Sequence, residues 1–365
     1  MKIGIDREQL KRFEDMLRHA IKSGDLLPGQ KMLSVDQLSK QFHISRLEVN
    51  LALRNLKRDK LIISFGTKGT YVLGVKPVIS LKKTICVITP GAPSTMNRKV
   101  MSGIENVLTV NGYDTLIKNT GNSQSKEEKL LRGMLNENAA GFIIEPSRSQ
   151  LLCKHVELYR RMEELGKPYI FIRSTYPQLA DKPRIVVDDS QGGYMITRHM
   201  IATIGENIVG IFRADDNRGA ERHRGYVQAL QEAGIPYRPE YVIWYHIEER
   251  MEKPTLALDE MLSKQPCDGI ICYDDAMATN ILYFLFQKGY SVPEDIAVAG
   301  YGNTAVATAG ELGLTTIAQP DELLGEIAAE YLIGMLNGEE EKDKKILKVL
   351  SPELVIRGST IGRGI

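Results

Sequence analysis

The chain has 365 residues, which is too many for one ordinary hydrophobic core and predicts about two or three domains. Its composition, 43% hydrophobic and 25% charged, is ordinary for a soluble globular protein. No apolar run reaches the length of a membrane span, and the first residues lack the apolar core of a signal peptide. We therefore expect a cytoplasmic protein with no membrane partner.

The net charge of +1 is divided unequally along the chain. Residues 1–73 carry 14 basic and 8 acidic residues, whereas the remainder carries 33 basic and 38 acidic residues. A basic head on a weakly acidic body is typical of a protein whose head binds nucleic acid. The alternative is that residues 1–73 are only a basic helical domain.

Cysteines and histidines give no sign of a metal site. Four cysteines are scattered through apolar segments, and the spacing of Cys267 and Cys272 does not fit a zinc knuckle. We expect buried free thiols, no metal and no cofactor.

The first predicted element is an amphipathic helix over residues 6–22, with an apolar face formed by Leu10, Phe13, Leu17 and Ile21. Two shorter helices follow, and their apolar residues recur close to helical spacing: Val35, Leu38 and Phe42 in one, and Leu47, Leu51, Leu53 and Leu56 in the next. Ser34 and Ser45 stand where N-caps belong, because a serine hydroxyl accepts from an otherwise unpaired amide of the first turn.

A β-hairpin is predicted next, with strands over residues 61–65 and 70–73. Two helices beside a basic hairpin predict a winged helix-turn-helix, and hence double-stranded operator DNA as a partner. The second helix can present Arg46, Asn50 and Arg54 to a major groove while Lys68 reaches a phosphate. Two half-sites need two heads, so we expect a homodimer.

Three motifs in this region resemble the winged helix of the GntR transcription factors: Leu27-Pro28-Gly29-Gln30-Lys31, Ile44-Ser45-Arg46 and Gly66-x-x-Gly69-Thr70-Tyr71-Val72. The resemblance implies family roles for Arg46, Lys68 and Gly69. The full DNA-binding set that we predict is Ser34, Ser45, Arg46, Asn50, Arg54, Lys68 and Gly69. The chain departs from the family at Asp36, where an acid replaces an arginine that typically contacts DNA, and at Glu48 and Asn50.

Residues 74–83 contain Gly, Pro and three lysines and read as a linker between domains 1–73 and 84–365. From Thr84 onward, apolar strands alternate with helices, which predicts an α/β body of parallel sheets covered by helices on both faces. The predicted strands are Ile85–Thr89, Asp114–Lys118, Gly141–Glu145, Tyr169–Arg173, Ile185–Val187, Ile208–Phe212, Tyr241–Trp244, Gly269–Tyr273, Ala297–Gly300 and Thr315–Ile317. The predicted helices are Arg98–Asn111, Ser125–Glu137, Tyr159–Leu165, Ser190–Ile204, Ala220–Ala233, Thr255–Ser263, Asp275–Lys288 and Pro320–Met335.

Four motifs of the body resemble the LacI-type effector domain, which is similar to periplasmic sugar-binding proteins: Val187-Asp188-Asp189-Ser190-Gln191-Gly192-Gly193, Cys272-Tyr273-Asp274-Asp275-Ala276-Met277-Ala278, residues 292–301 and Leu314-Thr315-Thr316-Ile317. With its winged head, the chain resembles the arabinose-responsive repressors of Gram-positive bacteria. The resemblance implies a bilobed body that the chain crosses near Val187, Gln319 and Glu340. Lobe 1 would comprise residues 84–186 and 320–339, and lobe 2 residues 187–319 and 340–362.

A small carbohydrate is the expected effector, bound by carboxylates and guanidiniums at strand ends facing the cleft between lobes. The predicted ligand-binding residues are Glu145, Arg173, Asp188, Asp215, Arg218, Arg222, Asp274 and Gln319. The resemblance assigns Arg222 the role of the inducer-contacting arginine. The alternative for each residue is a helix cap or a surface ion pair.

One departure affects the effector. The family pattern Gly-Tyr-Asp-Asp is replaced by Gly300-Tyr301-Gly302-Asn303, which removes a carboxylate acceptor. The same region is rich in arginine, namely Arg148, Arg173, Arg213, Arg218 and Arg222. These two features suit a phosphorylated or acidic sugar as an alternative to a neutral one.

The resemblance implies a repressor of carbohydrate-utilisation genes, released from its operator by a sugar such as arabinose. An enzyme is the first rival, but the chain lacks a G-x-S-x-G elbow, a phosphate-cradling loop and an H-E-x-x-H motif. A sensor that acts through a protein partner is the second, because Leu33, Asp36 and Glu48 depart from the DNA-binding pattern.

Overall fold

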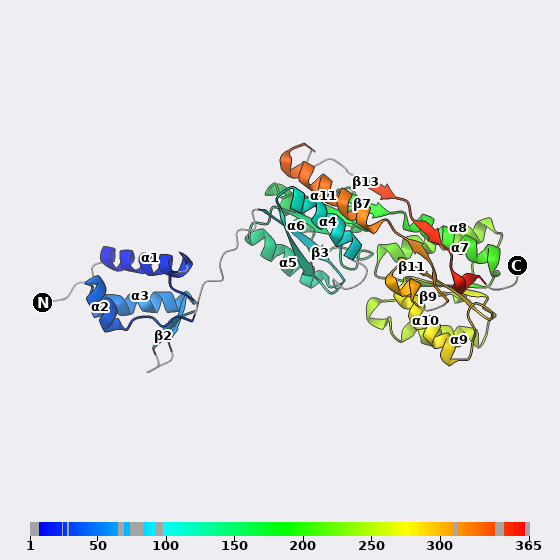
Figure 1. The fold of residues 1–365 in the computed structure, drawn as a ribbon, viewed down its shortest axis with the longest axis horizontal. Helices are drawn as coiled ribbons and strands as arrows, with labels where there is room; N and C mark the ends of the chain where they lie inside the picture. Colours follow the sequence, from blue (N-terminus) through cyan, green and yellow to red (C-terminus); the bar gives the residue numbers. More distant parts are fainter. Residues whose placement is uncertain are drawn as a thin grey trace. The chain divides into compact units, whose positions relative to one another are not determined.

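The computed structural model describes residues 7–23, 25–27, 29–64, 69–73, 83–91, 98–309, 312–339 and 347–361 (Figure 1). The chain divides into two compact units, the head (Met1–Ser80) and the body (Leu81–Ile365). Most of the expected linker lies outside the described residues, so its boundaries at residues 74 and 83 stay predictions. Within the described ranges, no helix has both the length and the apolar character that a membrane crossing requires.

The head contains three helices and a two-stranded hairpin, as predicted. The helices are α1 (Arg7–Ser23), α2 (Val35–Phe42) and α3 (Arg46–Arg58), and the antiparallel strands are β1 (Ile62–Ser64) and β2 (Thr70–Val72). The apolar faces form one core, which includes Phe13, Leu17, Leu38, Val49, Ala52, Leu56 and Ile62. The head therefore buries one stripe from each helix, and the polar faces stay outside.

The body contains two six-stranded sheets, which define its two lobes. The lobe 1 sheet has the order β13-β7-β6-β5-β3-β4, with bounds Leu347–Leu350, Arg184–Val187, Tyr169–Ile172, Gly141–Ile144, Thr84–Thr89 and Asp114–Asn119. The lobe 2 sheet has the order β14-β12-β11-β10-β8-β9, with bounds Glu353–Val355, Thr315–Ala318, Ala297–Tyr301, Gly269–Cys272, Ile208–Arg213 and Val242–Tyr245. Every neighbouring pair is parallel except β12 and β14.

Helices cover both faces of each sheet, as the strand–helix alternation predicted (Figure 1). In lobe 1, α4 (Arg98–Val110) and α11 (Asp321–Asn337) cover one face, and α5 (Gln124–Asn136) and α6 (Val156–Glu164) cover the other. In lobe 2, α7 (Asp189–Thr203) and α8 (Asn217–Glu232) lie opposite α9 (Lys253–Leu262) and α10 (Asp275–Gln287). Short 3₁₀ helices lie at Pro177–Leu179, Pro239–Tyr241, Ile247–Glu249, Ala305–Thr308 and Gly358–Thr360.

The chain passes between the lobes three times. Two crossings lie where they were expected, after β7 and after β12. The third lies between β13 and β14 rather than near Glu340, because β13 pairs in parallel with β7 of lobe 1. Residues 347–350 were therefore wrongly assigned to lobe 2. Two of the four residues of this edge strand, Leu347 and Val349, are about half exposed, so it gives no buried apolar run to detect.

Candidate functional site

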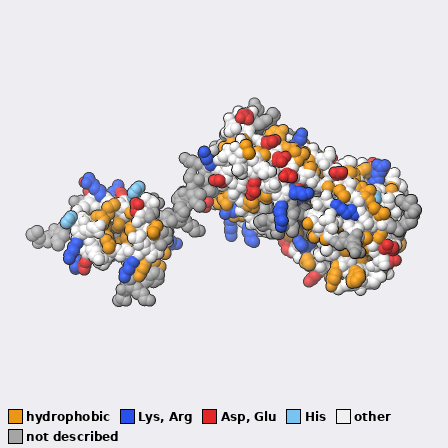
Figure 2. All heavy atoms as spheres, in the orientation of Figure 1, with side chains coloured by type: hydrophobic (Ala, Val, Ile, Leu, Met, Phe, Trp, Pro, Cys, Tyr) orange, Lys and Arg blue, Asp and Glu red, His pale blue; other side chains and the backbone are white. Residues whose placement is uncertain are grey.

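The face of α3 that was predicted to enter the DNA groove is open to solvent. Arg54 and Asn50 are exposed, and the Asn50 side-chain amide donates to the Arg46 carbonyl oxygen at 2.8 Å. Arg46 forms an exposed ion pair with Asp36 of α2 (2.7 Å). In Figure 2, lysine and arginine side chains stand at the surface of the head unit. Both α2 and α3 thus contribute to one charged surface.

The other predicted DNA-binding residues shape this surface. Ser34 and Ser45 are N-caps with complete capping boxes, and each hydroxyl accepts from a main-chain amide three residues later at 3.3 Å. Their capping role is confirmed, whereas direct DNA contact stays a prediction. Gly69 has a φ of +107°, which favours glycine in this turn. Lys68 lies outside the described residues.

In lobe 1, two of the predicted ligand-binding residues meet at the carboxyl edge of the sheet. Glu145 follows β5 and Arg173 follows β6, and both are buried. The Arg173 guanidinium lies 3.5 Å from the Glu145 carboxylate and donates to Asp321 Oδ1, at the start of α11, at 2.8 Å. Arg173 also has a φ of +63°, uncommon for a residue with a side chain. Parallel pairing of β5 and β6 thus sets this pair at one sheet edge.

In lobe 2, the carboxyl edge carries a second buried cluster, in which the predicted Asp215 and Arg218 meet Arg213 and Asp216. Asp216 accepts from Arg218 Nε at 3.1 Å and from Arg218 Nη2 at 2.6 Å. Asp215 accepts from Arg213 Nε at 2.7 Å. Burial alone would raise the pKa of Asp216, but Arg218 and Arg213 outweigh it and hold that pKa far below its ordinary value. Asp216 is therefore an anion at any physiological pH.

Arg222 lies one turn beyond Arg218 on α8 and is 2% exposed. Its Nε donates to Asp189 at 2.8 Å and its Nη1 donates to the Tyr273 carbonyl oxygen at 2.5 Å. The guanidinium lies 3.5 Å from the centroid of the Tyr301 ring, a distance suited to a cation–π contact. A Cβ on Gly193 of α7 would collide with the Arg222 main chain, so this glycine allows the close approach of α7 that sets Arg222 in place.

Ion pairs join the two lobes in this region, and one of them links the two clusters directly, between Arg218 Nη2 and Glu145 Oε1 at 3.2 Å. Charges alternate along the series Asp321, Arg173, Glu145, Arg218, Asp216, Arg213 and Asp215, which we name the interlobe charge network. Each buried arginine of the network thus has a carboxylate partner, as does Arg222. The arginine-rich composition of the region is consequently balanced by acids.

The remaining three predicted ligand-binding residues lie outside the network. Asp188 and Asp274 are N-caps of α7 and α10, accepting from the main-chain amides of Gln191 (2.8 Å) and Met277 (2.7 Å). Their helix-cap alternative is thus realised in the structure. Asp274 also lines a small hollow with Tyr245 and Tyr273. Gln319 is buried at the second crossing, and its carbonyl oxygen accepts from the Asp321 amide at 2.8 Å.

The departure at Gly302-Asn303 has a local structural explanation. Gly302 has a φ of +125°, so an aspartate there would be strained. Asn303 accepts from Arg357 Nη2 at 2.7 Å and is thereby held by the C-terminal segment. The neighbouring Asp275 accepts from Thr304 Oγ1 at 2.8 Å and Thr316 Oγ1 at 2.6 Å. Asp275 and Asn303 therefore stabilise the turn after β11.

Sequence reasoning missed the acids that pair with the predicted arginines, Asp189, Asp216 and Asp321, and the rings that contact Arg222, Tyr273 and Tyr301. The doublets Asp188-Asp189 and Asp215-Asp216 were visible signals. In the first doublet, the first residue caps the helix and the second is buried against Arg222. Which member turns inward depends on the residue at which the helix begins.

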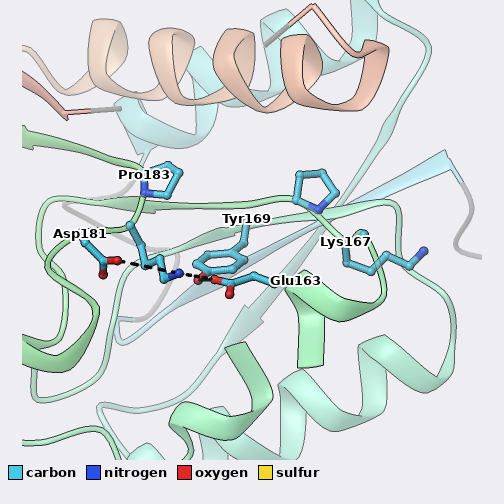
Figure 3. Close-up of a pocket in the computed structure, with 8 residues that line it drawn as sticks. Glu163, Lys167, Tyr169, Asp181 and Pro183 are labelled. Atoms are coloured by element: carbon cyan, nitrogen blue, oxygen red, sulfur yellow. Dashed lines mark hydrogen bonds and ion pairs between the residues drawn. The ribbon is translucent and has the colours of Figure 1, made fainter. Parts of the chain in front are cut away.

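A separate hollow lies at the opposite edge of the lobe 1 sheet (Figure 3). Its wall includes Tyr169 and Pro183, near the amino ends of β6 and β7, and the Tyr169 hydroxyl donates to Glu163 at 2.7 Å. Lys182 pairs with Glu163 at 2.8 Å inside it. Ligands of open parallel sheets bind at the carboxyl ends of the strands, so this hollow is not the candidate site.

Two family models match the chain. A model of bacterial regulatory proteins of the gntR family matches residues 10–72, which contain the helices and the hairpin of the head. A model of periplasmic binding protein-like domains matches residues 197–360, which contain most of lobe 2. These matches agree with the resemblances drawn from the motifs of the head and the body.

Two curated relatives match nearly the whole chain. The arabinose metabolism transcriptional repressor of Geobacillus stearothermophilus is 33% identical over 343 residues, 93% of each chain. The protein of the same name from Halalkalibacterium halodurans is 30% identical over 360 residues, 95% of each chain. The solved structure of a transcriptional regulator CelR–cellobiose complex matches 90% of this chain and all of its own, with a TM-score of 0.66 at 22% identity, and shows the same fold.

Proposed function

This chain belongs to the family of the arabinose metabolism transcriptional repressors, and on that premise we propose that it represses carbohydrate-utilisation genes until a small neutral sugar, such as arabinose, releases it from operator DNA. The observation that carries the proposal is the presence of two candidate binding sites in one chain, one in the head and one in the body. The head has an exposed basic helix face, and the body has buried charged groups at the carboxyl edges of both sheets. The chain would act in the cytoplasm, where the operator lies.

Two buried donors support a sugar as the effector. Nη1 of Arg218 and Nη2 of Arg222 are buried and have no hydrogen-bond acceptor among the described residues. A buried donor without an acceptor costs stability, and a sugar hydroxyl beside it would supply one. Because the two residues are one helical turn apart on α8, one small ligand can reach both.

The charge balance favours a neutral sugar over the anionic alternative. Arg173, Arg213, Arg218 and Arg222 each have a carboxylate within 2.8 Å of a guanidinium nitrogen. A phosphate or carboxylate on the effector would enter beside those acids and meet their repulsion without an uncompensated arginine to offset it. A neutral hydroxyl accepts from a guanidinium without disturbing these pairs.

Dimerisation would use the outer surface of lobe 2. Tyr283 and Phe286, three residues apart on α10, are 64% and 78% exposed. Met251 is also exposed and reaches Asn280 of the same helix. An exposed apolar surface of this kind is typical of a protein–protein interface, and a second copy would place two heads for two half-sites. Sedimentation of Phe286→Glu should give a monomer where the wild type gives a dimer.

Calorimetry and operator binding test the effector. The full chain is titrated with arabinose, glucose and arabinose 5-phosphate, and each sugar is then added to the chain bound to a duplex selected from a randomised pool. Binding of a neutral sugar, with release of the duplex, is the expected result. Binding of the phosphate alone would overturn the neutral-sugar assignment, and failure to select any duplex would overturn the repressor. Recovery of the sugar unchanged, by NMR, separates binding from catalysis.

A further inference from the structure

A second set of contacts between the lobes lies beside the interlobe charge network. It is made by the segment that follows β5, Ser147–Gln150, and by the segment that follows β8, Asp215–Asn217. Ser149 Oγ donates to Asp216 Oδ1 at 3.2 Å and accepts from the Asn217 amide at 3.0 Å. The Gln150 amide donates to the Asp215 carbonyl oxygen at 3.5 Å. We name these two segments the interlobe clasp.

The lobe 1 half of the clasp is anchored by a buried carboxylate. Glu127 of α5 is fully buried and accepts from the Ser147 amide at 2.8 Å. Its other oxygen accepts from the Tyr159 hydroxyl at 2.9 Å and the Tyr176 hydroxyl at 2.8 Å, and lies 3.0 Å from His155 Nε2. Burial is the main cause that raises the pKa of both tyrosines, and the charge of Glu127 raises it further. Each tyrosine hydroxyl therefore stays protonated and can donate. A carboxylate with this many donors has one fixed orientation.

Arg148, within the lobe 1 half of the clasp, makes further contacts with both lobes. Its φ of +51° is uncommon for a residue with a side chain and persists where surrounding contacts determine it. Here the Arg148 amide donates to Asn122 Oδ1 at 3.0 Å, and Nε donates to the Asn122 carbonyl oxygen at 3.2 Å. The Asn122 side-chain amide in turn donates to Asp215 Oδ2 at 3.0 Å, and the Arg148 guanidinium reaches Glu248 of lobe 2. Asp215 thus accepts from Asn122 of lobe 1 as well as from Arg213 of its own lobe.

From these contacts we propose that the interlobe clasp holds the two lobes together before the effector arrives, and that Glu127 is the positioning residue that presents it. The inference rests on the proposed function, because it assigns sugar binding to the state in which the lobes are together. The two buried donors assigned to the sugar, Arg218 Nη1 and Arg222 Nη2, take no part in the clasp contacts. The clasp therefore contributes to closure without contacting the ligand.

Linkage predicts how loss of the clasp changes the two affinities. If the lobes come apart more often, the apparent dissociation constant for sugar rises by the inverse of the population that remains together. Operator binding, which sugar opposes, favours the other state and becomes tighter in the absence of sugar. The two affinities thus move in opposite directions. A variant that only damaged the fold would weaken both.

Arg148→Ala is the first test, carried out on the full chain with arabinose and with the selected duplex. The Arg148 side chain is about one-third exposed, and its removal leaves the Glu127 cluster intact. We expect sugar binding to weaken and sugar-free operator binding to tighten, each by about five-fold or more, the lower end of allosteric coupling. Unchanged affinities, or a parallel fall in both, would overturn the clasp.

Glu127→Gln tests the anchor with the shape of the side chain preserved. The new amide nitrogen replaces an acceptor either for the Ser147 amide or for the tyrosine hydroxyls, so the Ser147 segment is held less firmly and the same opposite shifts are expected. The matched control is Glu128→Gln at the next position. Glu128 lies at the surface of α5 and pairs with Arg132, so neither affinity should change in this variant. If Glu127→Gln fails to fold, Arg148→Ala decides the question. Wild-type protein that binds neither sugar nor duplex would instead contradict the proposed function.

Discussion

Charged side chains serve the head and the body in opposite ways. On the head, Arg46 and Arg54 are exposed to solvent, and in the proposed function they would meet the phosphates of operator DNA. In the body, Arg218 and Arg222 are buried and already paired with carboxylates. A cation taken out of water without a partner is costly, so the body must satisfy its arginines before any ligand arrives. The same residue type is therefore dispensable for folding in one unit and required for it in the other.

The largest effect should come from removing a buried arginine. Arg222→Met leaves Asp189 buried without its ion-pair partner, so the free energy of unfolding should fall by about 3–5 kcal/mol. Urea denaturation of the full chain, followed by tryptophan fluorescence of Trp244 in lobe 2, measures the loss. Adding Asp189→Leu removes the stranded charge and should recover part of it. A loss below about 1 kcal/mol would contradict the buried-pair account.

Removing an exposed arginine of the head should leave stability nearly unchanged and weaken DNA binding. Arg46→Ala should change the free energy of unfolding by less than about 0.5 kcal/mol, as surface substitutions do. Binding to the selected duplex should weaken by about 1–3 kcal/mol if Arg46 contacts a base. Fluorescence anisotropy measures the affinity, with the equally exposed Arg12→Ala on α1 as the control. Equal losses for both variants would show that only total charge matters.

The helix caps of the head are polar groups near the surface that, unlike the exposed arginines, should contribute to the stability of the head. Ser45→Ala removes the acceptor for the Glu48 amide, and the head should lose about 1 kcal/mol of stability. Ser45→Asp keeps an acceptor at the N-cap and should lose far less. The thermal midpoint of the head transition measures both. A midpoint that does not move in Ser45→Ala would mean that packing alone holds α3.

The smallest predicted effect is a pH dependence in lobe 2. Burial lowers the pKa of His199 below its ordinary value of 6.5, so the folded protein binds this proton less readily than the unfolded chain. Its contribution to stability is present above pH 6.5 and is lost as the pH falls through the lowered pKa. Urea midpoints between pH 7.5 and 5.5 should decline less in His199→Gln, which can still contact Thr360. A steeper decline in the variant would contradict the predicted direction of the His199 contribution to the pH dependence of stability.

The sequence predicts an element well where its residues are continuously buried or where they contact residues close by in the chain. Interior strands such as β8 are fully buried and read as continuous apolar runs, so their positions and the α/β class were predictable. The edge strand β13 is half exposed and was missed. Ser34 and Ser45 were predictable as caps because a cap contacts residues three positions away.

The candidate site is harder to predict because its partners are far apart in the chain. Arg173 and Asp321 are separated by 148 residues, and Arg222 and Asp189 by 33. Sequence spacing cannot reveal such pairs, because the partners meet only when α11 packs beside β6 and α7 packs against α8. The predicted arginines were therefore found with two of their acids, Glu145 and Asp215, whereas Asp189, Asp216 and Asp321 were not. Arginine content alone did not show that these arginines are paired.

The three crossings between the lobes have a consequence for synthesis. Lobe 1 is encoded first but needs α11 and β13, which leave the ribosome after nearly all of lobe 2. Leu324 and Leu332 of α11 are fully buried in the lobe 1 core, so the nascent lobe exposes that apolar surface until residue 337 has emerged. The head, whose elements are consecutive, is complete within the first 73 residues. A chain stopped before α11 would therefore display a finished DNA-binding unit attached to an aggregation-prone body.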